Sequence, residues 1–484
     1  MRLDLSDTIV ALATPPGRGA IGIIRLSGPE AFEIADQIFS GKKLSVQPTH
    51  TAHFGRLRTR EGKDLDEVLA TIFHGSKSYT GQPTIEFSCH GSPFILQKAI
   101  ELCLSEGARL AEPGEFTMRA FLNGKLDLSQ AEAVADLIAS ESEAAHAVAL
   151  NQLRGGFRKE IEVLRDELIH FASLVELELD FSEEDLEFAD RTQLRELVVR
   201  IRQYLDGLIR SFSLGNAIKT GVTTVIAGRP NAGKSTLLNA LLNEARAIVS
   251  DIPGTTRDTI EEVLNINGIQ FRLVDTAGIR EAQDQIEAIG VQRTLDKVKE
   301  AAVLLYVWDV AGGMTLGEVF ADLENLQGDS MKLLVVCNKM DRNPHFRTDW
   351  LVDPGQADIH PYLLGDPPAD LSARAGMLEA AQLVPVSAKN EQNIALLKEK
   401  LFELASGGIL NLESTVVSNA RHFDALQRAE QALQDVLHGL DTGITGDFIA
   451  QDIRRALAYL GEITGEIGVD DLLANIFGKF CIGK

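Results

Sequence analysis

Residues 228–235 combine a glycine-rich turn with a lysine and a hydroxyl side chain, in the order Gly-Arg-Pro-Asn-Ala-Gly-Lys-Ser. They stand between an apolar, β-branched run, TTVIA, and a helix-forming run, STLLNALL. In this setting backbone N–H groups cradle phosphates at a helix N-terminus, the lysine reaches the β- and γ-phosphates, and the serine hydroxyl binds Mg²⁺. We therefore predict a nucleotide-binding loop. The residues expected against the nucleotide are Asn231, Ala232, Gly233, Lys234, Ser235 and Thr236.

Three further short motifs follow in order: DTAG at 275–278, NKMD at 338–341 and SAK at 387–389. The first aspartate reaches the Mg²⁺ shell, and the glycine of DTAG can approach the γ-phosphate. The aspartate of NKMD can accept hydrogen bonds from N1–H and N2–H₂ of guanine, two donors that adenine lacks. A turn-forming Asn and Asp would explain NKMD alone, but not four motifs in register, so we predict a GTP-binding domain. Its further site residues are Asp275, Thr276, Ala277, Gly278, Asn338, Lys339, Asp341, Ser387 and Ala388.

The hydrolytic residue is not evident from the motifs. Ras-type GTPases position the attacking water with a glutamine directly after DTAG, but Ile279 stands there and cannot hold water. Some other polar side chain must do so, or hydrolysis is slow. An exposed helix charge is the alternative interpretation of each candidate, and the residues alone leave the choice open. The candidates are Arg280, Glu281, Asp284 and Glu287.

The segment SDIPGTTRD, residues 250–258, is typical of a first switch loop. The hydroxyl of Thr256 is placed to complete the Mg²⁺ shell. The amide oxygen of Asn231 could hold a monovalent cation beside the phosphates, which would supply positive charge where an arginine finger is missing. The switch residues expected at the nucleotide are Ser250, Asp251, Ile252, Pro253, Gly254, Thr255 and Thr256.

The surrounding pattern predicts the elements that hold these motifs. Between about 222 and 389, five apolar runs each end in a loop and are separated by helical segments, which predicts a mostly parallel sheet covered on both faces. Helical periodicity fills about 126–215, opening with a capping box at Ser129-x-x-Glu132, and returns after about 410. The acidic stretch 176–190 is best explained as a solvated helix end and loop.

Residues 1 to about 120 mix β-leaning runs, glycines and prolines with one helical stretch at 93–107, which predicts a small α+β domain. The fold class is therefore multidomain, α+β and α/β, with a Ras-like G domain inserted into a helical domain. The predicted segments are 1–125 (α+β), 126–217 (helical), 218–406 (G domain) and 407–484 (helical, with the C-terminal tail).

Composition limits the class of protein. The chain has 484 residues, 45% of them hydrophobic, and a formal net charge of −23. That charge repels bare polyanions at long range, which disfavours DNA scanning, and a nucleic-acid partner such as tRNA must be met by a local basic patch or through another protein. No signal peptide and no apolar run of about 18 residues is found, which predicts a cytoplasmic protein with no membrane partner. Four scattered cysteines suggest neither a disulfide framework nor a zinc site.

The chain ends in FCIGK, which places Cys481 three residues from the terminus. A frayed and inert chain end is the simplest interpretation. A prenylation signal fits badly, because Gly483 is not aliphatic, Lys484 is not a usual last residue and no polybasic stretch precedes it. A functional thiol is the third interpretation.

Taken together, the motifs resemble those of the tRNA-modification GTPase family MnmE, also called TrmE. The similarity runs from ATPPGRGAIGIIRLSG near the N-terminus through FLNGKLDLSQAEAVADLI, LDFSEED, GRPNAGKSTLLN and DIPGTTRD to LGEITGE and the terminal FCIGK. It covers essentially the whole chain. The GTTRD loop and the terminal Cys-x-Gly-Lys are specific to this family rather than to GTPases at large.

The resemblance implies a function. Members of the family act with an FAD-dependent partner, MnmG (GidA), to install an aminomethyl or carboxymethylaminomethyl group on C5 of the wobble uridine of certain tRNAs. The N-terminal domain of the family resembles folate-dependent one-carbon transferases, binds a 5-formyl-tetrahydrofolate or related folate, and holds a homodimer together. Potassium drives dimerisation of the G domains and hydrolysis.

The resemblance also assigns residues. Glu287 matches the water-orienting glutamate of the family, and Cys481 becomes a candidate catalytic thiol beside the folate. No partner base lies near Cys481 in sequence, so a supporting role is the alternative. Without the family, an ion pair on a sheet edge would be the simpler interpretation of Arg25 and Glu86. The implied ligands are Ser235 and Thr256 for Mg²⁺, Asn231, Ser250, Ile252 and Thr255 for K⁺, and Arg25, Glu86, Lys125 and Lys484 for the folate.

The sequence departs from the family in two places. Ser182 stands where proline is usual, and the segment 343–375 is longer than usual beside the base pocket. Two other functions fit a GTPase: a regulatory or ribosome-assembly switch, and a one-carbon transferase with a regulatory GTPase attached. The first is disfavoured because the chain carries no KH domain with a basic GxxG loop.

Overall fold

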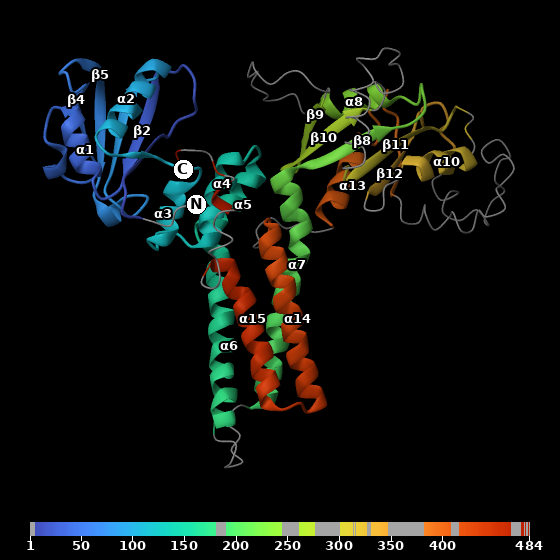
Figure 1. Ribbon diagram of the computed structural model, residues 1–484. Helices are drawn as coiled ribbons and strands as arrows, with labels where there is room; N and C mark the ends of the chain where they lie inside the picture. Colours follow the sequence, from blue (N-terminus) through green and yellow to red (C-terminus); the bar gives the residue numbers. More distant parts are fainter. Residues whose placement is uncertain are drawn as a thin grey trace. The chain divides into compact units, whose positions relative to one another are not determined.

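The structure is a computed structural model, shown in Figure 1. It describes residues 5–180, 190–243, 261–275, 301–312, 314, 316–326, 331–346, 382–407, 416–465, 476–478, 480 and 483. The chain forms two compact units, one of residues 1–139, 149–205 and 424–484, the other of residues 140–148 and 206–423. The division falls within α5 (Glu143–Leu153), α7 (Arg191–Thr220) and α14 (Ala420–Thr442). Our four-segment division of the chain stays a prediction.

The first unit begins with a seven-stranded sheet in the order β3-β4-β5-β6-β2-β1-β7. Neighbouring strands pair antiparallel, except for β1 and β7, which are parallel. The predicted α+β class is confirmed. The strands are β1 (Ile9–Leu12), β2 (Ile21–Ser27), β3 (Phe39–Ser40), β4 (Thr51–Arg58), β5 (Asp64–Phe73), β6 (Thr84–His90) and β7 (Arg109–Leu110), with short 3₁₀ turns η1 (Leu44–Val46) and η2 (Gly75–Lys77).

Two helices, α1 (Ala31–Ile38) and α2 (Pro93–Ser105), pack on this sheet and bury one apolar core with it. The sequence pattern predicted a single helix here, α2, and this prediction was wrong for residues 31–38. The signal was present, because Ala31, Ile34, Ala35 and Ile38 recur at helical spacing and are buried. The run was missed because it is only eight residues long.

The chain continues through α3 (Glu115–Leu122) and α4 (Leu128–Ala139). The N-cap of α4 is Asp127, two residues before the predicted Ser129. The Asp127 carboxylate accepts a hydrogen bond from the backbone N–H of Gln130 at 2.8 Å, and the Gln130 side chain accepts one from the backbone N–H of Asp127 at 3.0 Å. This is a capping box with an Asx cap, and it leaves Ser129 to donate to the same carboxylate at 2.6 Å.

Long helices make up the rest of this unit: α6 (Gly156–Asp180), the first half of α7, most of α14, and α15 (Gly446–Thr464). Figure 1 shows them side by side, and α15 packs along α6. The two helical stretches predicted far apart in sequence therefore form one bundle. Ion pairs join neighbouring helices, namely Arg200 with Glu167, Arg202 with Glu430 and Arg428 with Glu462.

The second unit contains a six-stranded sheet in the order β13-β12-β11-β8-β10-β9. All neighbours are parallel except β9 and β10, so the predicted mostly parallel sheet is confirmed. Strand β9 was not among the predicted strands. It pairs with β10 through a two-residue Asn267-Gly268 turn with φ of +50° and +86°, a dipeptide that favours hairpins. The strands are β8 (Val222–Ala227), β9 (Glu261–Ile266), β10 (Ile269–Asp275), β11 (Val303–Asp309), β12 (Lys332–Asn338) and β13 (Gln382–Pro385).

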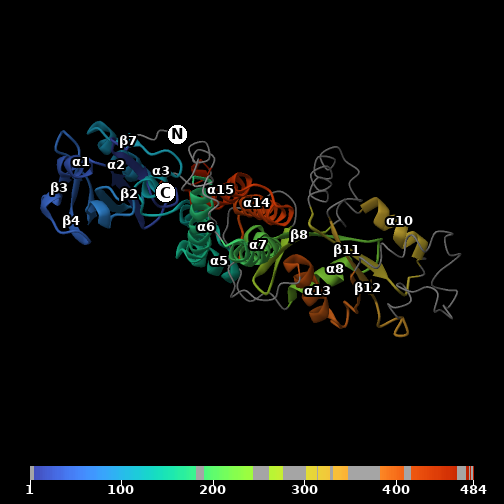
Figure 2. The same cartoon turned by 90° about the horizontal axis from the view of Figure 1, so that it is seen from below.

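Helices cover both faces of this sheet, as the continuous apolar strands require. Helices α8 (Lys234–Asn243) and α13 (Ile394–Ser406) share a core with one face, and α10 (Leu316–Leu326) shares a core with the other (Figure 2). The carboxyl ends of the parallel strands β8, β10, β12 and β13 therefore lie at one edge, where the predicted motifs follow them.

Candidate functional site

The predicted phosphate loop connects β8 to α8. Gly228 has φ of +149°, and a Cβ there would lie 2.3 Å from the carbonyl oxygen of Val307, so only glycine fits at the start of the loop. Asn231 and Gly233 also have positive φ, +64° and +96°. The Lys234 ammonium donates to the carbonyl oxygens of Gly228 at 2.9 Å and Arg229 at 3.1 Å. The loop is thus already curled around the lysine, with Ala232 buried and Ser235 and Thr236 at the start of α8.

The NKMD motif lies directly against this loop. The side-chain amide of Asn338 donates to the carbonyl oxygen of Ala232 at 2.8 Å, and its oxygen accepts from the backbone N–H of Ala388 at 3.1 Å. Lys339 donates to the carbonyl oxygen of Asn231 at 2.6 Å. The buried side-chain amide of Asn338 therefore joins Ala232 to Ala388. These two residues lie 106 and 50 positions from Asn338 in the chain.

The SAK motif positions the aspartate expected to recognise the base. Ser387 donates its hydroxyl to the Asp341 carboxylate at 2.7 Å, and this hydrogen bond lowers the pKa of Asp341. The carboxylate therefore stays ionised at neutral pH, in the form that can accept hydrogen bonds from a donor pair.

Two residues at this site, Arg229 and Asp309, make contacts that the motifs did not predict. Arg229, the second residue of the phosphate loop, forms ion pairs with Asp322 at 2.9 Å and Glu318 at 2.8 Å, both on α10. Asp309, the last residue of β11, lies 2.6 Å from the ammonium of Lys339. The position of Asp309 at the carboxyl end of a parallel strand was the available signal.

Of the other predicted nucleotide-site and tail residues, the structure describes Asp275. Asp275 ends β10, with its backbone paired in register to Ile226 of β8. The remaining predicted residues lie outside the part of the chain that the structure describes, as do Ser182, most of the long segment 343–375 and the acidic stretch after 180. These residues are Ser250, Asp251, Ile252, Pro253, Gly254, Thr255, Thr256, Thr276, Ala277, Gly278, Arg280, Glu281, Asp284, Glu287, Cys481 and Lys484.

In the first unit the structure brings Arg25 and Glu86 together. They are register partners on β2 and β6, and the guanidinium Nε lies 2.7 Å from the carboxylate. These strands are interior to the sheet, so the pair does not sit on a sheet edge. The guanidinium also lies 5.5 Å from the ring centre of Phe116 and 5.8 Å from that of Tyr79. An ion pair flanked by two aromatic rings suits a planar, hydrogen-bonding ring system.

The residues beside this pair are held by local contacts. Burial raises the pKa of Tyr79, and its hydroxyl is hydrogen-bonded to the Thr117 hydroxyl at 2.9 Å. Lys125 is exposed and donates to the carbonyl oxygen of Ser76 at 2.8 Å, so it lies over the loop that carries Tyr79.

A buried charge network fixes α3, the helix that supplies Phe116. Glu115 and Arg119, both essentially buried, form an ion pair at 2.9 Å, and Arg109 binds the same carboxylate at 2.6 Å. Asp7 pairs with both arginines. Burial alone would raise the pKa of Asp7 and of Glu115, but the arginine hydrogen bonds outweigh it and lower both. Because each charge is paired, the network can sit in the interior and orient the helix.

The C-terminal tail contacts this same part of the unit. Phe477 is fully buried in a cluster with Met118, Leu128 and Ala131. Gly483 is buried with φ of +102°, and its carbonyl oxygen accepts a hydrogen bond from Arg25 at 3.3 Å. The tail is therefore folded back beside the Arg25–Glu86 pair, which contradicts a frayed chain end at Gly483.

The three cysteines that the structure describes are buried, protonated thiols. Cys89, Cys103 and Cys337 are buried and not bonded in disulfides, and burial raises the pKa of each to about 12. They are thiols, not thiolates, at neutral pH. Within the described ranges no cluster of three or more His, Cys, Asp or Glu is arranged to hold a metal ion. None of the described helices has the length and apolar character needed to cross a membrane.

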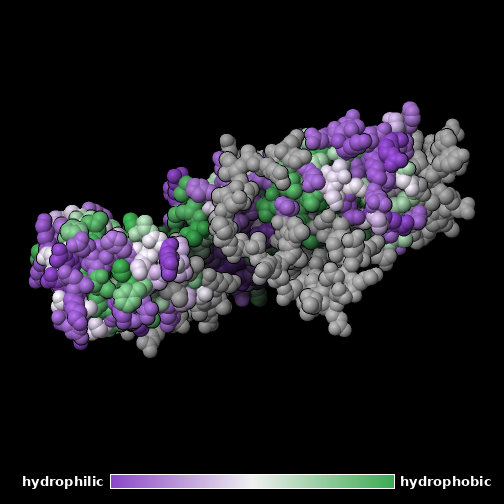
Figure 3. Space-filling view, turned by 90° about the horizontal axis from the view of Figure 1, so that it is seen from above, coloured by the Kyte–Doolittle hydropathy of each residue, from purple (hydrophilic) through white to green (hydrophobic). Residues whose placement is uncertain are grey.

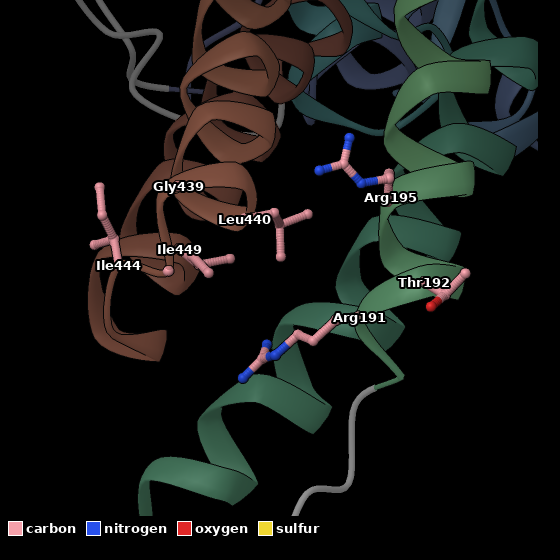
Figure 4. A pocket seen from close by; sticks show the side chains of 8 residues that line it. Arg191, Thr192, Arg195, Gly439, Leu440, Ile444 and Ile449 are labelled. Carbon is pink, nitrogen blue, oxygen red and sulfur yellow. The ribbon is translucent and has the colours of Figure 1, made fainter.

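A cavity of about 270 Å³ lies in the helical part of the first unit (Figure 4). Arg191, Thr192 and Arg195 of α7 line one side, facing Leu440 and Ile449 of the α14–α15 hairpin. Arg195 is paired with Asp441. None of the site residues that were predicted from the sequence belongs to the lining of this cavity.

Two family models and several named proteins match this chain over most of its length. The family model described as MnmE helical domain matches residues 128–481, and the one described as GTP-binding protein TrmE N-terminus matches residues 8–125. The protein named tRNA modification GTPase MnmE of Cytophaga hutchinsonii is 53% identical over 479 residues, which cover 99% of this chain and 98% of that protein. The protein of the same name from Christiangramia forsetii is 50% identical over 489 residues, the full length of both chains.

A solved structure of a variant of Aquifex aeolicus Era bound to GDP·AlF4⁻ is 25% identical, with a TM-score of 0.26. It covers 44% of this chain and 66% of that chain.

Proposed function

Because this chain belongs to the MnmE family of tRNA modification GTPases, we propose that it couples GTP hydrolysis to modification of C5 of the wobble uridine in tRNA. As a member of the family it is a GTPase that acts in tRNA modification, with GTP and Mg²⁺ at its G domain. The added group is aminomethyl or carboxymethylaminomethyl, the partner is the FAD-dependent MnmG (GidA), and a 5-formyl-tetrahydrofolate or related folate donates the carbon. The observation that carries this proposal is a phosphate loop and an aromatic-flanked Arg25–Glu86 pair in one chain.

The residues around Arg25 fit a folate. The Glu86 carboxylate can accept hydrogen bonds from the amide-like face of a pterin, and Arg25 can bind the formyl oxygen or an anionic glutamyl tail. Lys125 lies over the neighbouring loop and adds positive charge for the same tail. The buried position of Gly483 favours a role for the adjacent Lys484 as a folate ligand and for Cys481 as a thiol beside it.

The phosphate loop fits a nucleotide. The Lys234 ammonium donates to two loop carbonyls, and an arriving β- or γ-phosphate is a stronger acceptor for it. Ser235 and Thr256 would hold Mg²⁺. Asn231, with its exposed side chain on a left-handed turn, would hold K⁺ together with Ser250, Ile252 and Thr255, and the ion would supply charge beside the phosphates. Glu287 would orient the attacking water.

A homodimer through the N-terminal domain is the third part of the proposal. Phe54 and Leu69 face each other across β4 and β5 and are 65% and 47% exposed. Ser88 and Ile23 continue the same row of register partners across the sheet. Figure 3 shows one face of the chain, on which hydrophobic residues lie among hydrophilic ones. An uncharged row with exposed large side chains suits a second copy of the domain.

Mass analysis of tRNA from cells that lack this protein tests the proposal. We expect unmodified C5 on wobble uridine, restored by the wild-type protein but not by a Lys234→Ala variant, because that variant loses the phosphate contact. Fully modified uridine together with stalled ribosomal subunits would favour the assembly-factor alternative and contradict the proposal.

A glycine substitution tests whether the tail belongs to the folate site. In a Gly483→Ala variant the new Cβ would lie 2.2 Å from the carbonyl oxygen of Leu12, at φ of +102°, so the tail must move. We expect the affinity for 5-formyl-tetrahydrofolate, measured by calorimetry, to fall about tenfold or more.

Gly107→Ala is the matched control. Gly107 has a similar φ, +110°, but a Cβ there meets nothing within 4 Å, so it adds backbone strain without displacing a neighbour. We expect folate affinity within about twofold of wild type for this variant. Equal affinities for wild type and Gly483→Ala would remove the tail from the proposed site.

A further inference from the structure

Asp309 lies at the edge of the sheet where the phosphate loop, residues 228–235, meets the NKMD motif, residues 338–341. It ends β11 and is the register partner of Asn338, which ends β12. One carboxylate oxygen accepts the backbone N–H of Ala311 at 3.0 Å, and the other accepts the ammonium of Lys339 at 2.6 Å. Its side chain is only 16% exposed. The carboxylate is therefore held in one orientation and aims its second oxygen at Lys339.

Lys339 uses its ammonium as a bridge. Besides the Asp309 carboxylate, it donates to the carbonyl oxygen of Asn231 in the phosphate loop at 2.6 Å. Asn231 and Lys339 both have left-handed backbones, with φ of +64° and +69°. For residues other than glycine this conformation is unfavourable and persists where surrounding contacts hold it. The Asp309–Lys339–Asn231 chain supplies such contacts on both sides.

We propose that Asp309 is a positioning residue for nucleotide binding, which acts by holding the Lys339 ammonium against the phosphate loop. Without this carboxylate the flexible lysine, 23% exposed, is free to turn towards water. The carbonyl of Asn231 then loses its donor, and the loop relaxes before the nucleotide arrives. The groups proposed for the chemical step are not touched, so a bound nucleotide should still react.

Simple electrostatics makes the opposite prediction. Removing a carboxylate near a site for an anionic nucleotide should strengthen binding, because a repulsive charge is lost. A positioning role predicts weaker binding instead. The sign of the change therefore separates the two effects.

The test is equilibrium binding of mant-GDP to the full-length wild-type and Asp309→Asn proteins, with steady-state GTP hydrolysis alongside. We expect the Kd to rise about tenfold and kcat at saturating GTP to stay within about twofold. Glu399→Gln, on the exposed side of α13, removes the same charge and should bind as wild type. Unchanged or tighter binding by Asp309→Asn, or a fall in kcat as large as that in kcat/KM, would overturn the inference.

A double-mutant cycle with Lys339→Met shows whether Asp309 acts through the lysine. In the Lys339→Met background the Asp309 substitution should cost less than about twofold, because the bond is already lost. An undiminished loss would overturn the inference. If Asp309→Asn does not fold, Asp309→Glu takes its place in the same cycle with the same criterion. The inference rests on the proposed nucleotide site. If the wild-type protein fails to bind mant-GDP, both the proposed site and the inference are overturned. If the wild-type protein binds normally and the Asp309 variant is unaffected, the inference alone is overturned.

Discussion

A Gly233→Ala variant is expected to lose nucleotide binding by about 100-fold or more. Gly233 has φ of +96°, and a Cβ there would lie 2.3 Å from the side-chain nitrogen of Asn338. That nitrogen donates to the carbonyl oxygen of Ala232, so the new atom removes a buried hydrogen bond as well as straining the backbone. Backbone strain of about 1–3 kcal/mol and a lost buried bond of similar size sum to about 2–6 kcal/mol, a range centred above the roughly 2.8 kcal/mol that corresponds to 100-fold.

Mant-GDP titration measures the loss, and Gly407→Ala is the matched control. Gly407 is also left-handed, with φ of +65°, but a Cβ there would make only ordinary contacts at 3.6 Å with Ser213. We expect that variant to bind within about twofold of wild type, since it shares the backbone strain but not the clash. Binding by Gly233→Ala at wild-type affinity would show that Asn338 does not brace the loop.

The phosphate loop was predictable because its chemistry is local. Eight consecutive residues between a strand and a helix specify the turn, and the positive φ values at Gly228, Asn231 and Gly233 follow from that turn. The contact from Asn338 to Ala232 was not predictable, because 106 residues of chain separate the two. It depends on the order in which strands β8, β11 and β12 lie in the sheet, which the sequence does not state.

The N-terminal site shows the same limit. Arg25 and Glu86 suggested an ion pair or, through the family, folate ligands, and the structure makes them partners on interior strands. The aromatic neighbours Tyr79 and Phe116 were not predicted. Tyr79 comes from a loop, and Phe116 comes from α3, the helix that the buried charge network orients. Side chains brought in by long-range packing leave no spacing pattern in the sequence.

Two local errors have local causes. The cap of α4 was placed at Ser129, whereas Asp127 is the cap, because two overlapping capping boxes start two residues apart and spacing cannot choose between them. The β9–β10 hairpin was missed although Asn267-Gly268 favours such a turn. Because β9 pairs antiparallel with β10, the sheet is mixed at one edge. The parallel pattern of the other strands did not indicate this feature.

A Glu287→Ala variant is expected to keep its affinity for GTP and to lose about 100- to 1,000-fold in kcat, the size of effect expected when a group that orients or activates water is removed. Ile279 follows DTAG and cannot hold water, so hydrolysis must depend on another polar side chain. Steady-state hydrolysis in potassium and in sodium buffer, for wild type and variant, measures both the water-orienting role and the proposed cation. Wild-type protein should be much faster in potassium, and the variant should be slow in both salts.

Glu281→Ala is the control that makes this result specific, because Glu281 belongs to the same segment and was an equal candidate on sequence alone. It should retain wild-type kcat in potassium. A large loss in Glu281→Ala with none in Glu287→Ala would exchange their roles and contradict the assignment that the family resemblance supplied. Equal wild-type rates in potassium and sodium would mean that Asn231 and the loop 250–256 do not build a cation site. The charge beside the phosphates would then have to come from a protein side chain, and the GTPase would need a different mechanism with the same nucleotide-binding loop.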